Sequence, residues 1–246
     1  MVQTLSSTCA IAIMAKTPQA GRSKTRLCPP LTYEDAAKLS AAFLRDTSDN
    51  LAMSAKHAAI IPYAAYAPAG SEEALHHHLA PGTRLILADG TPQMPSDING
   101  FGRCLLHAIQ GMLAEGHEAA CVLSSDGPTL PTQLLIETAA ALLGQDDKAV
   151  LGPAADGGYY LLGLKKAHAH MFADIDWSTE RVADQTRARA RELGLPLYEL
   201  ATWNDADDAA SLSMLLDDRS GYPAPHTRKL ADQMQLSSLL KIGVVV

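Results

Sequence analysis

The sequence predicts an α/β protein with a mainly parallel β-sheet that has helices on both faces. An apolar run from Cys9 to Lys16 shows no alternation with polar residues, as expected of a strand buried on both faces. Strand-like and helix-like segments then alternate along the chain, which is typical of parallel β-α-β units. Charged residues directly follow several of these strands, where open α/β sheets bind their ligands.

Length and composition are those of an ordinary folded domain. The chain has 246 residues, of which 47% are hydrophobic and 19% charged, enough for a large core. The formal net charge of −7 disfavours nucleic acid and anionic membranes as partners. No run approaches the roughly 20 apolar residues that span a bilayer, and no secretion signal is evident. We therefore expect a cytoplasmic protein whose four cysteines, none in a C-x-x-C pair, form neither a zinc site nor a redox pair.

Apolar runs predict the strands in chain order. Pro62 lies within the second run, so we expect a bulge or an edge there. The stretch from Lys148 to Leu164 contains an Asp-Gly turn signal and is predicted as two strands around a turn. The predicted strands span residues 9–16, 58–67, 83–89, 118–126, 148–164 (two pieces) and 195–203.

Capping signals and turn residues predict the helices. Thr32 with Asp35 three residues later predicts the start of a helix over 33–54. Ser71 is expected to cap a short helix that runs through His76, His77 and His78. Further helices are predicted at residues 102–115, 132–143, 179–193 and 207–216. The segment from residue 220 is Pro-rich, then helical, and either packs on the domain or contacts another subunit.

The loop after the first strand concentrates positive charge in an acidic protein. The segment AKTPQAGRSKTRL, residues 15–27, holds two lysines, two arginines and no acid. Gly21 lets the backbone approach a phosphate, Arg22 and Arg26 are rigid forks for phosphate oxygens, and Lys24 is a mobile point charge. The segment lacks the GxxxxGK[ST] pattern of a Walker A motif. A solvated loop explains the same charges, so this segment alone leaves both readings open.

Acidic residues follow the later strands. Asp126 follows the fourth strand, Asp156 lies in DGGYY, and Asp205 and Asp207 lie in NDADD. Because the carboxyl ends of parallel strands meet at one edge of a sheet, we expect these acids to approach the basic loop. Mg²⁺ or Mn²⁺ would then bridge carboxylates and phosphate oxygens. Turn formation at Asp126 and Asp156, and helix capping in NDADD, are the ordinary alternatives.

Two other groups of residues are assigned to structure. His76, His77 and His78 resemble a metal cluster, but neighbouring side chains on a helix point to different sides. We therefore expect exposed polar histidines there. Trp177 and Trp203 are expected to pack in the core or at its rim.

Five motifs together resemble those of a bacterial family of GT-A-type transferases that is labelled DUF2064 and often found beside radical-SAM enzymes. The family is in turn similar to the molybdopterin nucleotidyltransferases and to phospholactate guanylyltransferase. Each motif is modest alone, but all five in one order are specific. They are AKTPQAGRSKTRL, SSDGPTLP, GPAADGGYYLLGL, DWSTERVADQT and NDADDAASL.

The resemblance implies a Rossmann-like sheet of the GT-A type that binds a nucleotide. It implies one transferase domain over residues 1–219 and a C-terminal extension over 220–246. It assigns Lys24 and Arg26 to the phosphate-binding loop and Asp126 to the metal-binding acid.

The resemblance also assigns the later motifs. Asp156, Gly157 and Gly158 match an acceptor or sugar loop, and Asp205 with Asp207 matches a late DxD pair that would complete the metal site. The family has a further acid where this chain has Ser211; either Asp208 replaces it or that acid is structural. The loop at residues 90–101 is looser than the family form.

Two reactions fit these residues. In nucleotidyl transfer, a small phosphorylated acceptor attacks a nucleoside triphosphate, Lys24 and Arg26 neutralise the leaving pyrophosphate, and a metal ion on Asp126 bridges the reacting oxygens. In glycosyl transfer from a nucleotide sugar, Asp156 or Asp205 deprotonates the acceptor. The basic loop favours nucleotidyl transfer, because a triphosphate carries more charge. A non-catalytic nucleotide-binding protein is a third reading, disfavoured by the retained Asp126. The acceptor, the nucleobase and a homo-oligomeric state stay open.

Overall fold

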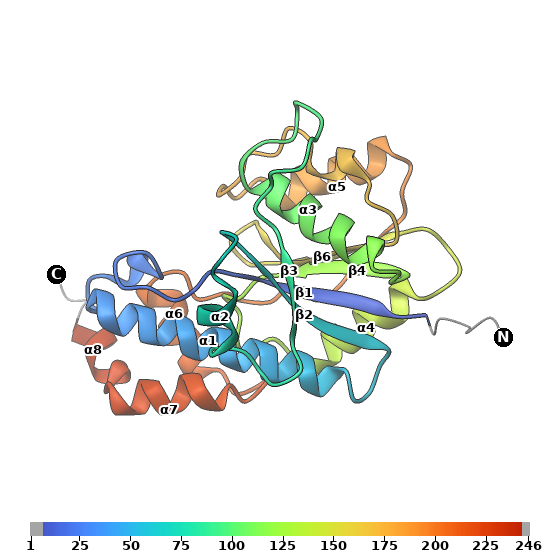
Figure 1. The fold of residues 1–246 in the computed structure, drawn as a ribbon. Helices are drawn as coiled ribbons and strands as arrows, with labels where there is room; N and C mark the ends of the chain where they lie inside the picture. Colours follow the sequence, from blue (N-terminus) through green and yellow to red (C-terminus); the bar gives the residue numbers. More distant parts are fainter. Residues whose placement is uncertain (1–6, 243–246) are drawn as a thin grey trace.

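A seven-stranded sheet runs through the centre of the structure, a computed structural model that describes residues 7–242 (Figure 1). The strand order is β3-β2-β1-β4-β6-β5-β7. Only β6 runs antiparallel to its neighbours β4 and β5, while the other pairs are parallel. The predicted mainly parallel sheet is confirmed. The strands are β1 (Cys9–Ala15), β2 (Ile60–Tyr66), β3 (Arg84–Leu87), β4 (Ala119–Leu123), β5 (Ala149–Pro153), β6 (Tyr159–Leu164) and β7 (Leu197–Glu199).

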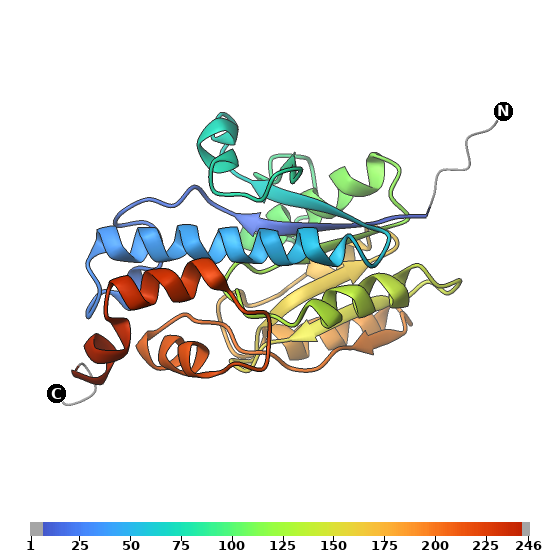
Figure 2. The ribbon, with the colours of Figure 1, turned by 90° about the horizontal axis from the view of Figure 1, so that it is seen from below.

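Helices cover both faces of the sheet. Figures 1 and 2 show α3 and α5 on one face and α1 and α4 on the other. The helices are α1 (Tyr33–Ser54), α2 (Glu72–His76), α3 (Gly100–Ala114), α4 (Thr132–Leu142), α5 (Val182–Glu192), α6 (Ala209–Asp217), α7 (Pro225–Gln233) and α8 (Leu236–Ile242), with short 3₁₀ turns at Thr25–Leu27 and Ala169–Phe172.

The strand β1 divides the core into two layers. Ile11 and Ile13 face α1 and α4, whereas Ala10 and Ala12 face α3. Because successive side chains of a strand point to opposite faces, an apolar run without alternation has to be buried on both sides. Residues 9–13 are all fully buried, as the sequence predicts.

Local capping sets the start of α1. The Thr32 hydroxyl oxygen accepts a hydrogen bond from the Asp35 backbone N–H at 3.1 Å. This contact satisfies one of the N–H groups that have no partner inside the helix. The predicted bounds of α1 are confirmed at both ends.

The prediction for the histidine-containing helix needs correction. Ser71 stands at the N-cap position of α2, but its hydroxyl donates to the Pro68 carbonyl at 2.7 Å and does not cap the helix. Serine side chains readily bond to nearby backbone in this way. The helix ends at His76, so His77 and His78 lie beyond it.

The prediction for Pro62, a bulge or an edge, is confirmed only as a local edge. The strand β2 lies between β1 and β3, and its register with both neighbours has no bulge. Pro62 pairs with Ile11 of β1, whereas β3 begins to pair only at Tyr63. Proline is tolerated because the strand has no partner on its β3 side at this residue.

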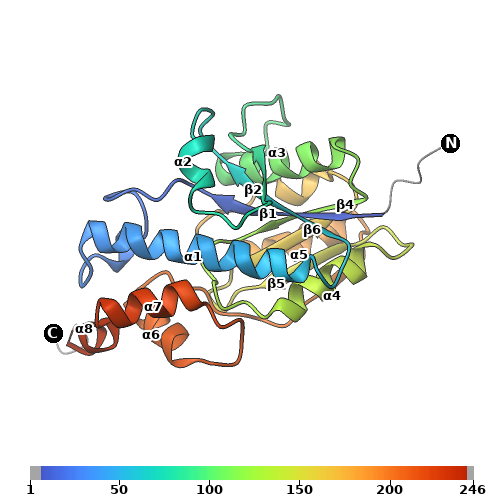
Figure 3. The same cartoon turned by 60° about the horizontal axis from the view of Figure 1, so that its bottom comes forward.

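The C-terminal helices pack on the long helix α1. Figures 2 and 3 show α7 alongside α1, with α6 and α8 close by. A separate apolar cluster joins these helices and the 3₁₀ turn of the first loop, through Leu27, Leu39, Phe43, Leu212, Leu215, Ala231 and Leu236. The terminal valines 244–246 lie outside the described residues. No helix within residues 7–242 is long and apolar enough to cross a membrane.

Candidate active site

A cleft of about 760 Å³ opens at the carboxyl ends of β1, β2 and β4. The first loop forms one wall, and the N-terminal end of α3 forms another. The position is where open α/β sheets bind ligands. Its charged lining consists of Lys16, Arg22, Lys24, Arg26, Asp126 and Asp207.

The first loop is folded by its own backbone. The N–H groups of Arg22 and Ser23 both donate to the Gln19 carbonyl, at 3.1 and 3.0 Å. Gly21 has a φ of 75°, a left-handed conformation that favours glycine. Lys24 also has a positive φ, of 50°. The turn leaves Arg22 exposed at the cleft and directs Lys24 inward.

The Lys24 ammonium lies between the acids of two other loops. Its Nζ is 2.6 Å from Asp126 Oδ1, 2.7 Å from the Ala206 carbonyl and 3.4 Å from Asp207 Oδ1. The side chain is 6% exposed and its Nζ lies 4.9 Å from the centre of the Phe43 ring. Lys24 therefore links the basic loop to both acidic loops and neutralises part of their charge.

Backbone hydrogen bonds hold the acidic loops together. The Trp203 N–H donates to Pro153, and the Ala155 N–H donates back to Trp203, each at 3.1 Å. The Ala206 N–H donates to the Asp126 carbonyl at 3.0 Å. These bonds connect the end of β5, the segment after β7 and the end of β4, so each acid is fixed relative to the others.

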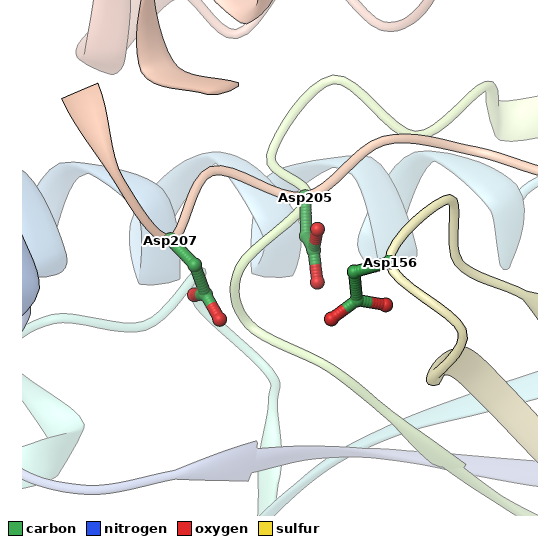
Figure 4. A group of neighbouring side chains, drawn as sticks. All are labelled: Asp156, Asp205 and Asp207. Carbon is green, nitrogen blue, oxygen red and sulfur yellow. The ribbon is translucent and has the colours of Figure 1, made fainter. Parts of the chain in front are cut away.

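Three carboxylates form a group at this edge of the sheet. Asp156, Asp205 and Asp207 each offer an oxygen, and these oxygens lie within 4.8 Å of one another. Figure 4 shows the Asp205 and Asp156 carboxylates close to each other, with Asp207 beside them. It is the only such group of three or more ligand side chains within the part of the chain that the structure describes. Carboxylate oxygens are the ligands of Mg²⁺ and Mn²⁺.

The electrostatics of this group favour a cation. Burial, together with the neighbouring charges of Asp156, Asp207 and Asp126, raises the pKa of Asp205 to about 6. Like charges at short range disfavour ionisation of one another. A bound cation would remove this repulsion.

The membership of the acidic group differs from the predicted metal set. The sequence suggests Asp126, Asp205 and Asp207, with Asp156 on an acceptor loop. In the structure Asp156 joins Asp205 and Asp207, whereas Asp126 pairs with Lys24.

The DGGYY motif is a turn that needs both its aspartate and its first glycine. The Gly158 N–H donates to Asp156 Oδ1 at 2.8 Å. Gly157 has a φ of 90°, and a Cβ there would lie 2.1 Å from the Glu180 carbonyl oxygen. The turn fixes the position of the Asp156 carboxylate, which is exposed.

The last aspartate of NDADD has a capping role. Asp208 accepts a hydrogen bond from the Ser211 N–H at 2.8 Å, and the Ser211 hydroxyl accepts one from the Asp208 N–H at 3.0 Å. This reciprocal pair is a capping box at the start of α6. The expectation that one of these aspartates caps the helix is confirmed.

The sequence-selected residues divide into three sets. Arg22, Lys24, Arg26, Asp126 and Asp207 line the cleft. Asp156 and Asp205 lie beside it in the acidic group. Gly21, Gly157 and Gly158 shape the loops that carry these side chains.

Sequence reasoning missed two parts of the site. Lys16 lines the cleft at the end of β1, and its place directly after a buried strand is a signal that could have found it. Phe101, Tyr159 and Trp177 form an aromatic cluster beside the cleft, with ring centres 5.8 and 6.4 Å from that of Trp177. Only the fold brings these three segments together. Packing of Trp177 and Trp203, as expected, is confirmed by their contacts with the two clusters of the core.

The order of the strands and the cleft at their carboxyl ends are those of the Rossmann-like transferase fold of the GT-A type, and this is the class of the protein. A protein from Desulfovibrio desulfuricans G20, provisionally named a nucleotide-diphospho-sugar transferase, has a TM-score of 0.82 and 27% identity, over 96% of this chain and 97% of that one. A cytidylyltransferase from Leptospira borgpetersenii shares the fold, with a TM-score of 0.50 and 11% identity, over 95% of this chain and 97% of that one. Both structural neighbours carry the names of transferases.

The chain belongs to the family described as "Uncharacterized protein conserved in bacteria (DUF2064)", whose sequence profile matches residues 47–179. The matched region contains Asp126 and the DGGYY turn. A comparison with curated proteins found no match. Rv0371c from Mycobacterium tuberculosis H37Rv in a complex with manganese has a TM-score of 0.45 at 17% identity, over 86% of this chain and 99% of that one.

Proposed function

We propose that the protein is a metal-dependent nucleotidyltransferase. It transfers a nucleotidyl group from a nucleoside triphosphate to a small phosphorylated acceptor and releases pyrophosphate. The observation that carries this proposal is one cleft edge that joins a cationic loop to a group of three carboxylates. A nucleotide triphosphate with its metal ion needs both kinds of group at once.

The donor set fits a divalent cation. Asp156, Asp205 and Asp207 would hold the ion, with Asp126 as a fourth acid, which pairs with the Lys24 ammonium. All of these are hard oxygen donors, which suits Mg²⁺ or Mn²⁺. When bound, such an ion stabilises negative charge that builds up on the phosphate oxygens.

The cationic wall fits a triphosphate. Within residues 7–242 neither Lys16 nor Arg22 forms an ion pair, and both are exposed at the cleft. The Arg26 side chain is 69% exposed, and its contact with Asp207 is a long one of 3.4 Å. The side chain can therefore turn toward a ligand. These three side chains would bind the β- and γ-phosphates. The Lys24 ammonium would lie between these phosphates and the carboxylates, where its positive charge attracts both.

The chemistry needs positioning and charge more than acid–base catalysis. An oxygen of the acceptor phosphate forms a bond to the α-phosphorus, and the bond from that phosphorus to the bridging oxygen breaks. The electron pair leaves with pyrophosphate. Because the attacking phosphate is already ionised, no proton has to be removed, and Lys24 with the two arginines balances the leaving charge.

Glycosyl transfer from a nucleotide sugar is the second candidate. The name of the Desulfovibrio relative, at 27% identity over nearly the whole chain, favours it. In that reaction the same cleft would hold a nucleoside diphosphate, and Asp156 or Asp205 would accept the proton of an acceptor hydroxyl.

Pyrophosphate release tests the proposal. Purified protein is incubated with each nucleoside triphosphate, Mg²⁺ or Mn²⁺ and a panel of small phosphate monoesters. We expect pyrophosphate with one triphosphate, dependent on both the metal and the acceptor. The variants Asp126→Asn and Asp205→Asn should lose this activity, and Asp146→Asn, a change at a side chain that is 84% exposed, should retain it. Full activity in both site variants would rule out the assigned acids.

A further inference from the structure

A second, smaller pocket adjoins the cleft at Asp126. Its volume is about 170 Å³, less than a quarter of that of the cleft. Four residues line both spaces: Met14, Phe101, Ser125 and Asp126. The pocket therefore begins where the acid and the basic loop meet, and it extends toward β6 and α3.

The walls of this pocket are mainly apolar and aromatic. Three of the ten lining residues, Ser124, Ser125 and Asp126, are polar. The other seven are Met14, Phe101, Leu105, Val122, Leu123, Tyr159 and Tyr160. The lining contains no lysine, arginine or histidine among the described residues, and its one carboxylate is Asp126 at the boundary. A phosphate inside the pocket would meet no cation, whereas an uncharged apolar group would be removed from water.

The pocket is braced from behind. The Trp177 ring packs edge-on against both Phe101 and Tyr159. At Gly102 a Cβ would lie 2.9 Å from the Trp177 ring, so the glycine allows α3 to pack tightly on the tryptophan. The shape of the pocket is thus fixed by packing before any ligand arrives, which lowers the cost of binding.

One polar group in the wall lacks a partner. The Tyr160 hydroxyl donates to the Ala201 carbonyl at 2.9 Å. The Tyr159 hydroxyl is buried and has no hydrogen-bond partner within residues 7–242. Because this hydroxyl is enclosed by the protein, it presents no polar group to the pocket.

We infer that the small pocket binds the organic group of the acceptor, and that this group is uncharged and apolar. On the proposed nucleotidyl transfer, on which this inference rests, the acceptor is a phosphate monoester of a small apolar alcohol, with an aryl or branched alkyl group. Its phosphate stays in the cationic cleft, and its apolar part fills the pocket. A sugar phosphate fits this lining poorly, because its hydroxyls would lose their hydrogen bonds to water.

Calorimetric titration with three phosphates tests the inference. The probes are phenyl phosphate, glycerol phosphate and inorganic phosphate. We expect phenyl phosphate to bind at least about tenfold more tightly than glycerol phosphate. This difference in affinity corresponds to the burial of roughly one small apolar group. Phe101→Ala should remove this preference and leave the affinity for inorganic phosphate unchanged. Phe101 is 46% exposed, so the variant should fold.

One control completes the test. Tyr33→Ala removes another exposed aromatic side chain, 54% exposed, and should keep the preference. Equal binding of the phenyl and glycerol esters, or a preference that survives Phe101→Ala, would overturn the inference. Triphosphate binding with Mn²⁺, measured on the same protein, separates the two claims: if it fails while the phenyl preference holds, the proposed reaction is wrong and the ligand class of the pocket stands.

Discussion

Lys24 lies among the acids of the site and interacts with the same carboxylates as a metal ion would. Its ammonium lies 2.6 Å from Asp126 and 3.4 Å from Asp207, in the same acidic surroundings that a metal ion would enter. Two cations close together repel each other, so metal binding and the Lys24 contacts compete. The same charge is needed by the triphosphate, because Lys24 belongs to the loop that lines the cleft.

Lys24→Met should therefore have opposite effects on two ligands. Two unit charges about 4 Å apart interact by about 1–4 kcal/mol at effective dielectric constants of water and protein surfaces, and the substitution would remove a repulsion of this order. We expect Mn²⁺ to bind the nucleotide-free variant at least about fivefold more tightly, and triphosphate to bind it more weakly. Lys38→Met, at an exposed pair with Asp35 on α1, should change neither. Weaker Mn²⁺ binding in Lys24→Met would contradict the competition.

Gly157 and Gly70 form a matched pair for testing the DGGYY turn. Their φ values are 90° and 88°, but a Cβ at Gly157 would meet the Glu180 carbonyl at 2.1 Å, whereas nothing lies within 4 Å at Gly70. Gly70→Ala should cost about 1–2 kcal/mol of unfolding free energy for the left-handed backbone alone. Gly157→Ala should cost a further 1–3 kcal/mol or more from the clash. Urea denaturation of both variants measures the difference; equal losses would mean that the turn yields without strain.

At the scale of elements, one buried carboxylate attaches α7 to α1. Asp46 is fully buried, and its two oxygens accept hydrogen bonds from the His226 and Thr227 N–H groups at 3.0 and 2.7 Å. These are unsatisfied donors at the start of α7, so Asp46 caps a helix that lies far away in the sequence. Burial raises the pKa of this carboxyl group, against the opposing effect of the hydrogen bonds.

Asp46→Ala should loosen the C-terminal helices. Losing a charged acceptor for two N–H groups should cost roughly 2 kcal/mol, seen in urea denaturation and as faster hydrogen exchange in α7. Asp49→Ala, one turn further along α1, removes a partly exposed carboxylate that pairs with Arg45 and His226, and should cost less than about 1 kcal/mol. Unchanged protection of α7 in Asp46→Ala would show that the apolar cluster alone holds it.

Elements with local signals were predictable from the sequence, and those that depend on pairing were not. The start of α1 follows from the Thr32 cap, and the β5–β6 hairpin follows from its Asp-Gly turn. The strand β7 is shorter than its apolar run, because it pairs with β5 only over Leu197–Glu199. Whether Pro62 has a neighbouring strand on both sides depends on the residue at which β3 begins to pair. No local sequence pattern encodes that residue.

The site was predictable as a set of strand ends, but its internal contacts were not. The convergence of Asp126, Asp205 and Asp207 with the basic loop follows from the rule for parallel sheets. That Asp156 joins the acidic group depends on the bridge between Ala154 and Trp203, a pairing between distant segments. The pairing of Lys24 with Asp126 and the bracing of Phe101 by Trp177 are likewise tertiary contacts.

At the scale of the whole molecule, the end of the sheet opposite the cleft contains a titratable cluster. His117 precedes β4, and its ring nitrogens lie 2.8 Å from the Thr8 hydroxyl and 2.9 Å from the Tyr63 hydroxyl. Burial lowers the pKa of His117, assisted by the charge of Arg84 and opposed by that of Glu115. The folded protein therefore favours the neutral imidazole.

This cluster predicts how stability depends on pH. The unfolded chain, with a histidine pKa of about 6.5, takes up the proton before the folded protein does. The contribution of His117 is therefore complete above about pH 6.5 and is lost as the pH falls from there through the lower pKa of the folded state. His117→Gln should flatten the fall in unfolding free energy between about pH 7 and 5, whereas His57→Gln, at an exposed residue, should not. An unchanged slope in His117→Gln would contradict this assignment.

The central claim is that the cleft binds a nucleoside triphosphate together with a divalent metal. The most direct measurement is the melting temperature with nucleoside triphosphates and with nucleotide sugars, each with and without Mg²⁺ or Mn²⁺, since a ligand that binds the native state raises it. We expect a metal-dependent rise with one triphosphate, no rise with the sugars, and loss of the rise in Asp205→Asn. A rise with a nucleotide sugar alone, or one that needs no metal, would contradict it.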